Sequence, residues 1–142
     1  MDWKNELGSI MERKTPTTRA EQENAGFEVF LDTVAVPGLN EIAEELLKKH
    51  NRDAQVRRAP ASVTLSVRAN DTEEISFRVM KHYVKNGILP RAEVRVNRGM
   101  HITKHESMFR ADPQNYTISA VTQEDVIMTF IKFYRMGLDS GV

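Results

Sequence analysis

The two ends of the chain carry apolar residues at helical spacing. Residues 19–36 and 37–50 each show an apolar stripe, and Pro37 separates the two segments. The pattern leaves open whether they form one kinked helix or a pair of helices. At the C-terminal end, Thr122 is placed to cap a helix and Gly137 to end it. The predicted core stripe of this last helix is Ile127, Phe130, Ile131 and Tyr134, with Phe130 and Ile131 the most buried.

Between these helices apolar and polar residues alternate, which is typical of β-strands. The alternation is clearest in residues 62–68 and 75–80. Because successive side chains of a strand point to opposite faces, the length of a turn decides which residues before and after it share the buried face. Val67 therefore shares a face with Ile75 or Phe77 if a loop of three or five residues joins the two strands.

Asn86-Gly87 is a strong hairpin signal. If these two residues form the loop, the register of the flanking strands follows directly. The buried face then pairs apolar residues, Phe77 with Val96 and Val79 with Val94. The opposite face pairs basic residues, Arg78 with Arg95 and His82 with Arg91.

The segment 101–110 fits two structures. As a strand it turns Ile102 inward, and as a helix it begins with a capping box at Thr103; we favour the strand. A short final strand is predicted over 116–121. The fold class is therefore α+β, an antiparallel meander of about five strands with the N- and C-terminal helices packed on one face.

We assign residues 1–18 to a helical arm and linker, and residues 19–142 to a single α+β domain. In the arm, Trp3 and Leu7 lie one helical turn apart. The last helix also has more apolar surface than one packing contact needs. Because a monomer seldom leaves a large apolar patch in water, we expect a homodimer whose contact includes the arm or the last helix.

Charge is unevenly distributed along a chain whose formal net charge is zero. Residues 1–50 contain 6 Lys and Arg against 10 Asp and Glu, and residues 51–111 contain 12 against 6. The excess of basic residues thus falls on the predicted sheet. Either the sheet is simply solvated there, or it meets an anionic partner.

The register gathers basic side chains on the face opposite the core. With His105 placed there by a fifth strand, near Glu93, the candidate anion-binding residues are Arg68, Arg78, Arg91, Arg95, His82 and His105. Guanidinium groups suit phosphate or carboxylate because their donors form a fixed fork. The competing interpretation is that Glu93 and water screen the like charges.

The sequence does not contain the residues that several classes of functional site require. The chain has no cysteine and no glycine-rich phosphate-binding or nucleophile motif, and we expect neither a cofactor nor a metal. His101 and His105 are too far apart on a strand to share zinc. The longest uncharged run, residues 113–123, is 11 residues, too short for a membrane span. We expect a cytoplasmic protein that does not associate with membranes.

These observations predict a non-catalytic binding or adaptor protein whose basic sheet face engages an anionic partner. That partner could be a nucleic acid backbone, an acidic protein surface or a phosphorylated small molecule. The alternative is a small enzyme in which His82, His105 and Glu93 act as acid–base groups and the arginines hold an anionic substrate. A third interpretation is a structural module in which the sheet face is inert.

Overall fold

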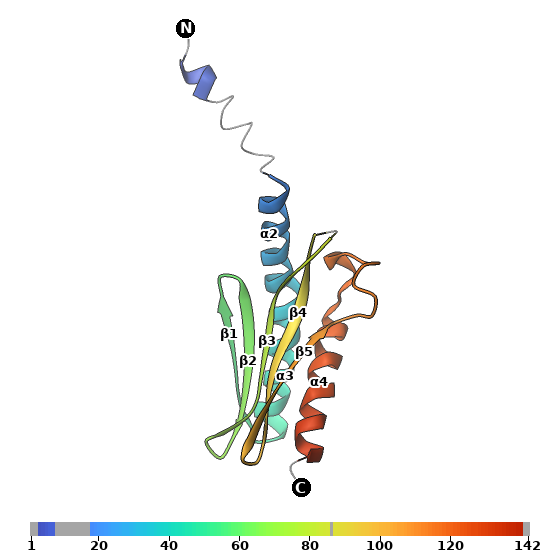
Figure 1. Cartoon of the computed structure of the whole chain (residues 1–142). Helices are drawn as coiled ribbons and strands as arrows, with labels where there is room; N and C mark the ends of the chain where they lie inside the picture. Colours follow the sequence, from blue (N-terminus) through green and yellow to red (C-terminus); the bar gives the residue numbers. More distant parts are fainter. Residues whose placement is uncertain (1–2, 8–17, 86, 141–142) are drawn as a thin grey trace.

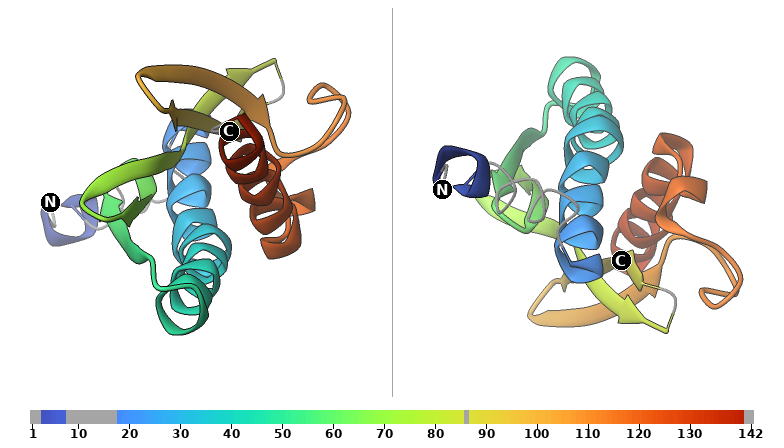
Figure 2. Two further views of the ribbon diagram at one scale, coloured as in Figure 1. Left: turned by 90° about the horizontal axis from the view of Figure 1, so that it is seen from below. Right: turned by 90° about the horizontal axis from the view of Figure 1, so that it is seen from above.

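A computed structural model describes residues 3–7, 18–85 and 87–140 of the chain. It confirms the α+β fold, with a five-stranded antiparallel meander and helices from both ends of the chain on one face (Figures 1 and 2). The sheet order is β1-β2-β3-β4-β5. The helical elements are α2 (Arg19–Phe30), η1 (Leu31–Ala35), α3 (Val36–Lys49), η2 (Ile118–Ala120) and α4 (Gln123–Ser140). The strands are β1 (Asp53–Ala59), β2 (Ser62–Ala69), β3 (Thr72–Val84), β4 (Gly87–Arg98) and β5 (His101–Met108).

The N-terminal helical segments form one continuous helix rather than a pair. The α2 and α3 segments are joined without a break by η1, a single stretch of π-helix. The N–H of Val36 donates to the carbonyl of Leu31, five residues back. Pro37 has no N–H, and in a regular α-helix its ring would clash with the carbonyl of Thr33. The helix passes the proline through the wider π geometry instead of breaking.

The core lies between the inner face of the sheet and the helices. Phe77 of β3 is fully buried, and its ring lies 5.5 Å from that of Phe130 and 6.1 Å from that of Phe109. Phe130 is buried as predicted, but Ile131 is only half-buried, so that part of the prediction is wrong. The most buried residues of α4 are Val126, Phe130 and Phe133.

The β3–β4 hairpin keeps the predicted faces but not the predicted pairs. Val84 pairs with Gly87 instead of Lys85 with Ile88, and Phe77 faces Val94 rather than Val96. The error arises at Gly87, whose φ of 135° lies in a region that L side chains rarely adopt. The glycine therefore stands beside the loop instead of within it. Because the shift is two residues, every side chain stays on its predicted face.

The β2–β3 hairpin also reaches its predicted faces by an unexpected route. Its loop contains two residues, Asn70 and Asp71, which have φ of 52° and 64° as in a type I′ turn. The predicted loop of three or five residues is wrong. A register shift between Val67 and Arg68 restores the parity, so Val67 faces Ile75 on the buried side.

Two strand assignments need correction. Residues 53–59 form β1, which the pattern did not predict, whereas residues 116–121 contain a 3₁₀ turn instead of a strand. Residues 101–108 form β5, as favoured, but Ile102 points outward and is 66% exposed. The two-residue turn after Arg98 pairs it with His101 and puts Thr103, not Ile102, opposite the buried Val96.

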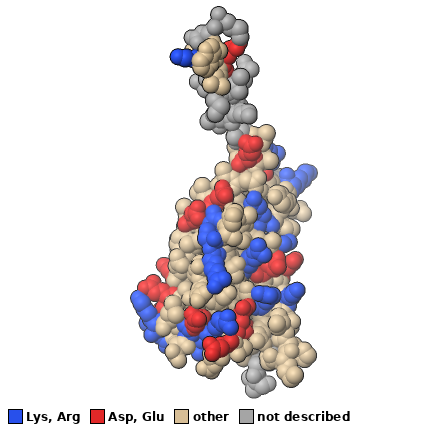
Figure 3. Space-filling view, turned by 90° about the vertical axis from the view of Figure 1, so that its left-hand side faces the viewer, with Lys and Arg blue, Asp and Glu red and all other residues tan. Residues whose placement is uncertain are grey.

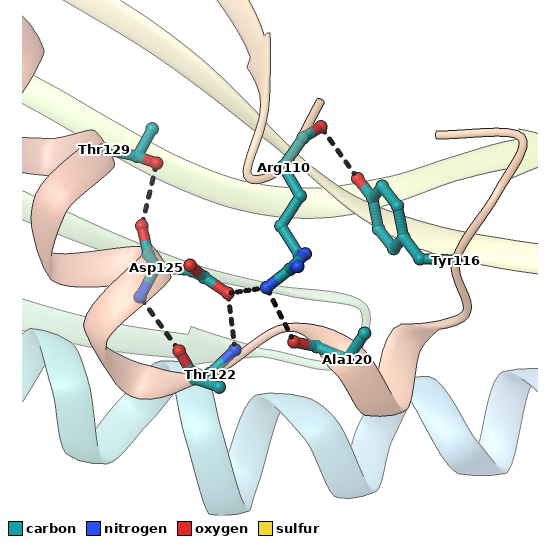
Figure 4. Close-up of polar contacts among 6 residues, drawn as sticks. All are labelled: Arg110, Tyr116, Ala120, Thr122, Asp125 and Thr129. Atoms are coloured by element: carbon teal, nitrogen blue, oxygen red, sulfur yellow. Dashed lines mark hydrogen bonds and ion pairs between the residues drawn. The ribbon is translucent and has the colours of Figure 1, made fainter. Parts of the chain in front are cut away.

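The start of α4 is a capping box that Figure 4 shows in detail. The backbone N–H of Asp125 donates to Thr122 Oγ1 at 3.1 Å, and the N–H of Thr122 donates to Asp125 Oδ2 at 3.0 Å. Arg110 also lies 3.5 Å from Asp125 Oδ2, and its carbonyl accepts a hydrogen bond from the Tyr116 hydroxyl. These contacts tie the connection after β5 to the first turn of α4.

Gly137 lies inside α4 and does not end it, because the helix continues to Ser140. A Cβ atom at this position would lie well inside van der Waals contact of Val96 Cγ1 on β4. The glycine therefore permits a close approach of helix and sheet. The prediction that Gly137 ends the helix is therefore wrong.

Part of the predicted arm is described. Residues 3–7 are helical and exposed, whereas residues 1–2 and 8–17 of the predicted arm and linker lie outside the described residues. In the part of the chain that the structure describes, no helix combines the length and the apolar character needed to cross a membrane.

Candidate binding face on the outer side of the sheet

The side chains of the sheet that point away from the helices form the outer face. Antiparallel pairing arranges them in rows that run across the strands. One row contains Gln55, Ser66, Ser76, Arg95 and Lys104, and its neighbour contains Arg57, Thr64, Arg78, Glu93 and Glu106. The outer face thus mixes charges. Among the described residues, its basic members are Arg57, Arg68, Arg78, Arg91, Arg95 and Lys104, and its acidic members are Asp53, Glu73, Glu93 and Glu106.

Thr64, Ser66 and Ser76 form the centre of this face, and we call them the hydroxyl floor. Adjacent strands place them side by side, since Ser66 faces Ser76 and Thr64 faces Arg78. Ser76 is only 8% exposed. None of the three hydroxyl groups forms a hydrogen bond to another described residue, so all three can act as donors to a ligand.

Arg78 and Arg95 border the hydroxyl floor on different strands. They are diagonal neighbours, because Arg78 faces Glu93 and Arg95 faces Ser76. The predicted direct pairing of the two arginines is therefore wrong. Arg78 is exposed and forms no ion pair within 4.0 Å with a described residue. Arg95 is also exposed, and its nearest acidic atom is Glu73 Oε1 at 3.8 Å.

A like-charge pair that was not predicted lies one strand further on. On its other side Arg95 faces Lys104 of β5. Arg68 borders the hydroxyl floor from β2 and donates to the carbonyl of Asp71 at 3.0 Å. Figure 3 shows the side of the molecule on which the β1–β2 hairpin lies. Lys and Arg side chains form a narrow column there, with Asp and Glu side chains on both sides.

Arg91 belongs to a different environment from Arg78 and Arg95. It faces Met80, and its guanidinium lies 3.9 Å from both Glu93 and Glu106. Its side chain is mostly buried, and its Nε has no hydrogen-bond partner among the described residues. Two carboxylates already neutralise this guanidinium, so Arg91 is a poor ligand for a further anion.

His82 keeps the outer side of the sheet, in register with Arg78 and Met80, whereas His105 does not join that face as predicted. His82 lies near the end of β3, opposite the buried Leu89. His105 faces Val94 on the inner side of the sheet, where its ring lies 5.5 Å from that of Phe133. Its Nε2 is 3.0 Å from Thr103 Oγ1. The predicted proximity of His105 and Glu93 on one face is therefore wrong, and the acid–base set of the enzyme alternative is not assembled.

Sequence reasoning missed two basic residues of the outer face, Arg57 and Lys104. Arg57 lies on β1, which was not predicted, and Lys104 was assigned to the other side with the wrong orientation of β5. The signal for Lys104 was present in the alternation of residues 101–108, because the exposed Ile102 and Lys104 share a face.

A second polar cluster connects the helices to the edge of the inner face. Glu74 Oε1 accepts hydrogen bonds from Arg52 Nε at 2.8 Å and from the Tyr134 hydroxyl at 2.7 Å. Burial, followed by the hydrogen bond to Glu74, raises the pKa of Tyr134 to about 12. The interaction with Glu74 also raises the pKa of Arg52. This cluster links β3 and α4 to the residues that follow α3.

The described residues include no group of three or more potential metal ligands. His101 and His105 share a face of β5 four residues apart, a separation of roughly 13 Å along a strand. Comparison of the chain with protein-family models, with curated proteins and with solved structures finds no match.

Proposed function

We propose that the protein is a non-catalytic binding or adaptor protein whose outer sheet face engages an anionic partner. The observation that carries this proposal is Arg78, which stands beside the hydroxyl floor and forms no ion pair with any described residue, although Glu93 lies directly across the strand pair. A guanidinium group that keeps its donors free, next to unpaired hydroxyl groups, suits the oxygen atoms of phosphate or carboxylate.

The repulsion between Arg95 and Lys104 favours the same ligand chemistry. Like charges directly opposite each other on neighbouring strands destabilise a sheet by a few tenths of a kcal/mol, up to about 1 kcal/mol. An anion placed between Arg78, Arg95 and Lys104 offsets this repulsion. The folded state therefore gains more from binding than the attraction of a single exposed charge would give.

The spread of the basic residues favours an extended partner over a single small anion. Arg57, Arg78, Arg95 and Lys104 come from β1, β3, β4 and β5. With neighbouring strands about 4.8 Å apart, these residues cover roughly 19 Å across the sheet. A chain of phosphate or carboxylate groups can contact several of them at once.

The outer face lacks the aromatic residues that stack single-stranded bases. Its apolar members among the described residues are Met80, Ile102 and Met108. Proteins that bind single strands on a sheet generally stack bases on aromatic side chains. The proposal therefore concerns contacts with the charged groups of a partner, such as the backbone of a duplex or an acidic protein segment, and not the recognition of bases.

The proposal is tested by the affinity for two probes, a 20-base-pair DNA duplex and a poly-glutamate peptide, at low salt. We expect the double variant Arg78→Ser/Arg95→Ser to lose most of the binding of whichever probe the wild type binds. The matched control is Lys48→Ser/Lys49→Ser, which removes the same charge from the exposed side of α3. Equal affinities for the two variants, or no binding of either probe by the wild type, contradict the proposal.

A further inference from the structure

A groove of about 310 Å³ lies between α3 and α4, remote from the outer face in the sequence and in the fold. Its lining is almost entirely apolar. The apolar residues are Ile42 and Leu46 from α3, and Ile127, Phe130, Ile131 and Tyr134 from α4. Ile42, Ile127 and Ile131 pack only partly against the core. A single copy of the described chain thus leaves a contiguous apolar surface in contact with water.

The chain itself contains a segment with the chemistry to fill this groove. Residues 3–7 are helical, with Trp3 63% exposed and Leu7 52% exposed. These two side chains lie one turn apart, as the anchors of a helix in a groove do. Lys4 follows Trp3, and of the two carboxylates on the α3 side of the groove Glu45 is paired with Lys49 at 3.3 Å, which leaves Glu41 as the acidic neighbour for Lys4.

The distances favour the groove of a second copy over the groove of the same chain. Ile42 lies 24 residues beyond Thr18 along one continuous helix, a separation of roughly 36 Å. The 11 residues from Leu7 to Thr18 span at most about 36–40 Å when fully extended. The near end of the groove is closer, because Ile127 lies beside Gly38, about 30 Å from Thr18 along the helix. The arm of the same chain would therefore reach the near end only when largely extended, and Ile42 only when almost completely extended. Figure 1 shows residues 3–7 beyond the opposite end of the long helix.

We infer that the protein forms a dimer in which residues 3–7 of each copy dock in the α3–α4 groove of the other. A reciprocal exchange of this kind closes with two-fold symmetry, because each copy supplies one arm and one groove. A large aromatic side chain buries about 150–250 Å². The exchange buries two such side chains and their leucine neighbours, so the interface is small and we expect a weak dimer whose population depends on concentration.

The test uses the fact that Trp3 is the single tryptophan of the chain. The full-length variant Ile131→Lys keeps Trp3 but has a charged group in its groove. The full-length variant Trp3→Ala/Leu7→Ala has an intact groove and no tryptophan. When the second variant is added in excess to the first, we expect the tryptophan emission to shift to shorter wavelength, because the arm of the first enters the groove of the second.

Two controls keep this experiment decisive. A protein that carries Trp3→Ala, Leu7→Ala and Ile131→Lys has neither a tryptophan nor an intact groove, so adding it should cause no shift. If Ile131→Lys perturbs folding, Ile42→Lys on the α3 wall of the groove takes its place and should give the same results. The arm variant and each groove variant should also dimerise roughly thirtyfold or more weakly than the wild type in sedimentation, as expected for an interface hot spot. Leu47→Ala, on the same helix but outside the groove, should leave the dimer unchanged.

Three results overturn the inference. The first is the absence of a shift when the two variants are mixed. The second is a wild-type tryptophan that is buried at all concentrations in a protein of monomer mass, which would place the arm in its own groove. The third is a stable dimer that survives both arm and groove substitutions.

Discussion

The two faces of the same sheet follow different rules. On the inner face, Val63, Leu65, Phe77 and Val94 are fully buried, and each has a fixed neighbour in the core. On the outer face, the same strands carry Arg78, which forms no ion pair with a described residue, and Arg95, whose nearest acidic atom is 3.8 Å away. We expect the inner face to determine stability through packing, and the outer face, on our proposal, to contribute little to stability and to serve in binding. Substitutions on the inner face should therefore change stability, whereas substitutions on the outer face should change binding.

Phe130 on the inner side of the fold should give the largest loss of stability. Its side chain is buried against Phe77 and Tyr134. We expect Phe130→Ala to lower the free energy of unfolding by about 3–5 kcal/mol, through lost transfer energy and the cavity that remains. Met128→Ala on the exposed side of the same helix should change it by less than about 0.5 kcal/mol. Urea titrations of both variants measure the difference, and similar losses would mean that α4 does not cover the sheet as described.

Replacement by alanine should have opposite effects on stability at two glycines that lie in helices. Gly137→Ala places a methyl group against Val96, and we expect a loss of about 1–3 kcal/mol from overpacking. Gly26 lies in α2 with no atom within 4 Å of a Cβ position. Gly26→Ala should therefore raise stability by about 0.5–1 kcal/mol, because glycine is a poor helix former. A stabilising Gly137→Ala would show that α4 stands farther from β4.

The Glu74 cluster should produce a pH dependence in the alkaline range. The pKa of Tyr134 is raised to about 12 in the folded state, so the folded protein keeps the hydroxyl proton that the unfolded chain releases near its ordinary pKa. The stabilisation is thus fully present below that ordinary value and is lost as the pH rises toward 12. We expect Tyr134→Phe to reduce this alkaline loss and to cost about 1 kcal/mol at neutral pH.

The smallest effect on stability is expected for the outer face itself. Arg78→Ser/Arg95→Ser removes the repulsion between Arg95 and Lys104, but it also removes the 3.8 Å contact of Arg95 with Glu73. These opposing contributions should leave the free energy of unfolding within about 0.5 kcal/mol of the wild type. Urea titrations at low and high salt measure it. A clear destabilisation at both salt concentrations would assign the arginines a structural role and remove the distinction between the two faces.

The difference between the faces also explains which features the sequence predicted. Burial of alternate residues constrains parity, so Phe77 and Val94 were placed on the correct face even though their partners were displaced by two residues. Contacts between outer side chains depend on the register itself, so the same displacement replaced the expected Arg78–Arg95 pair by Arg78–Glu93. The position of Gly87 beside the loop depends on backbone geometry that the pattern Asn86-Gly87 alone does not specify.

Other errors have similarly local causes. The β1 strand lies at the edge of the sheet, where its only buried apolar side chain is Ala54 and the alternation is weak. Glycine commonly ends a helix, so the sequence predicted an end at Gly137. The glycine is instead required inside α4, because Val96 lies very close to it. That requirement comes from a residue about 40 positions away in the chain, and local sequence rules do not include it.

The salt dependence of polyanion binding tests the central claim most directly, that the outer face is a binding surface for phosphate or carboxylate groups. The logarithm of the binding constant for duplex DNA falls with the logarithm of the salt concentration, with a slope near −0.9 for each phosphate contact. We predict that Arg78→Ser/Arg95→Ser makes this slope less steep by about 2, whereas Lys48→Ser/Lys49→Ser leaves it unchanged. An unchanged slope in the sheet variant, or an equal change in the α3 control, would contradict the account.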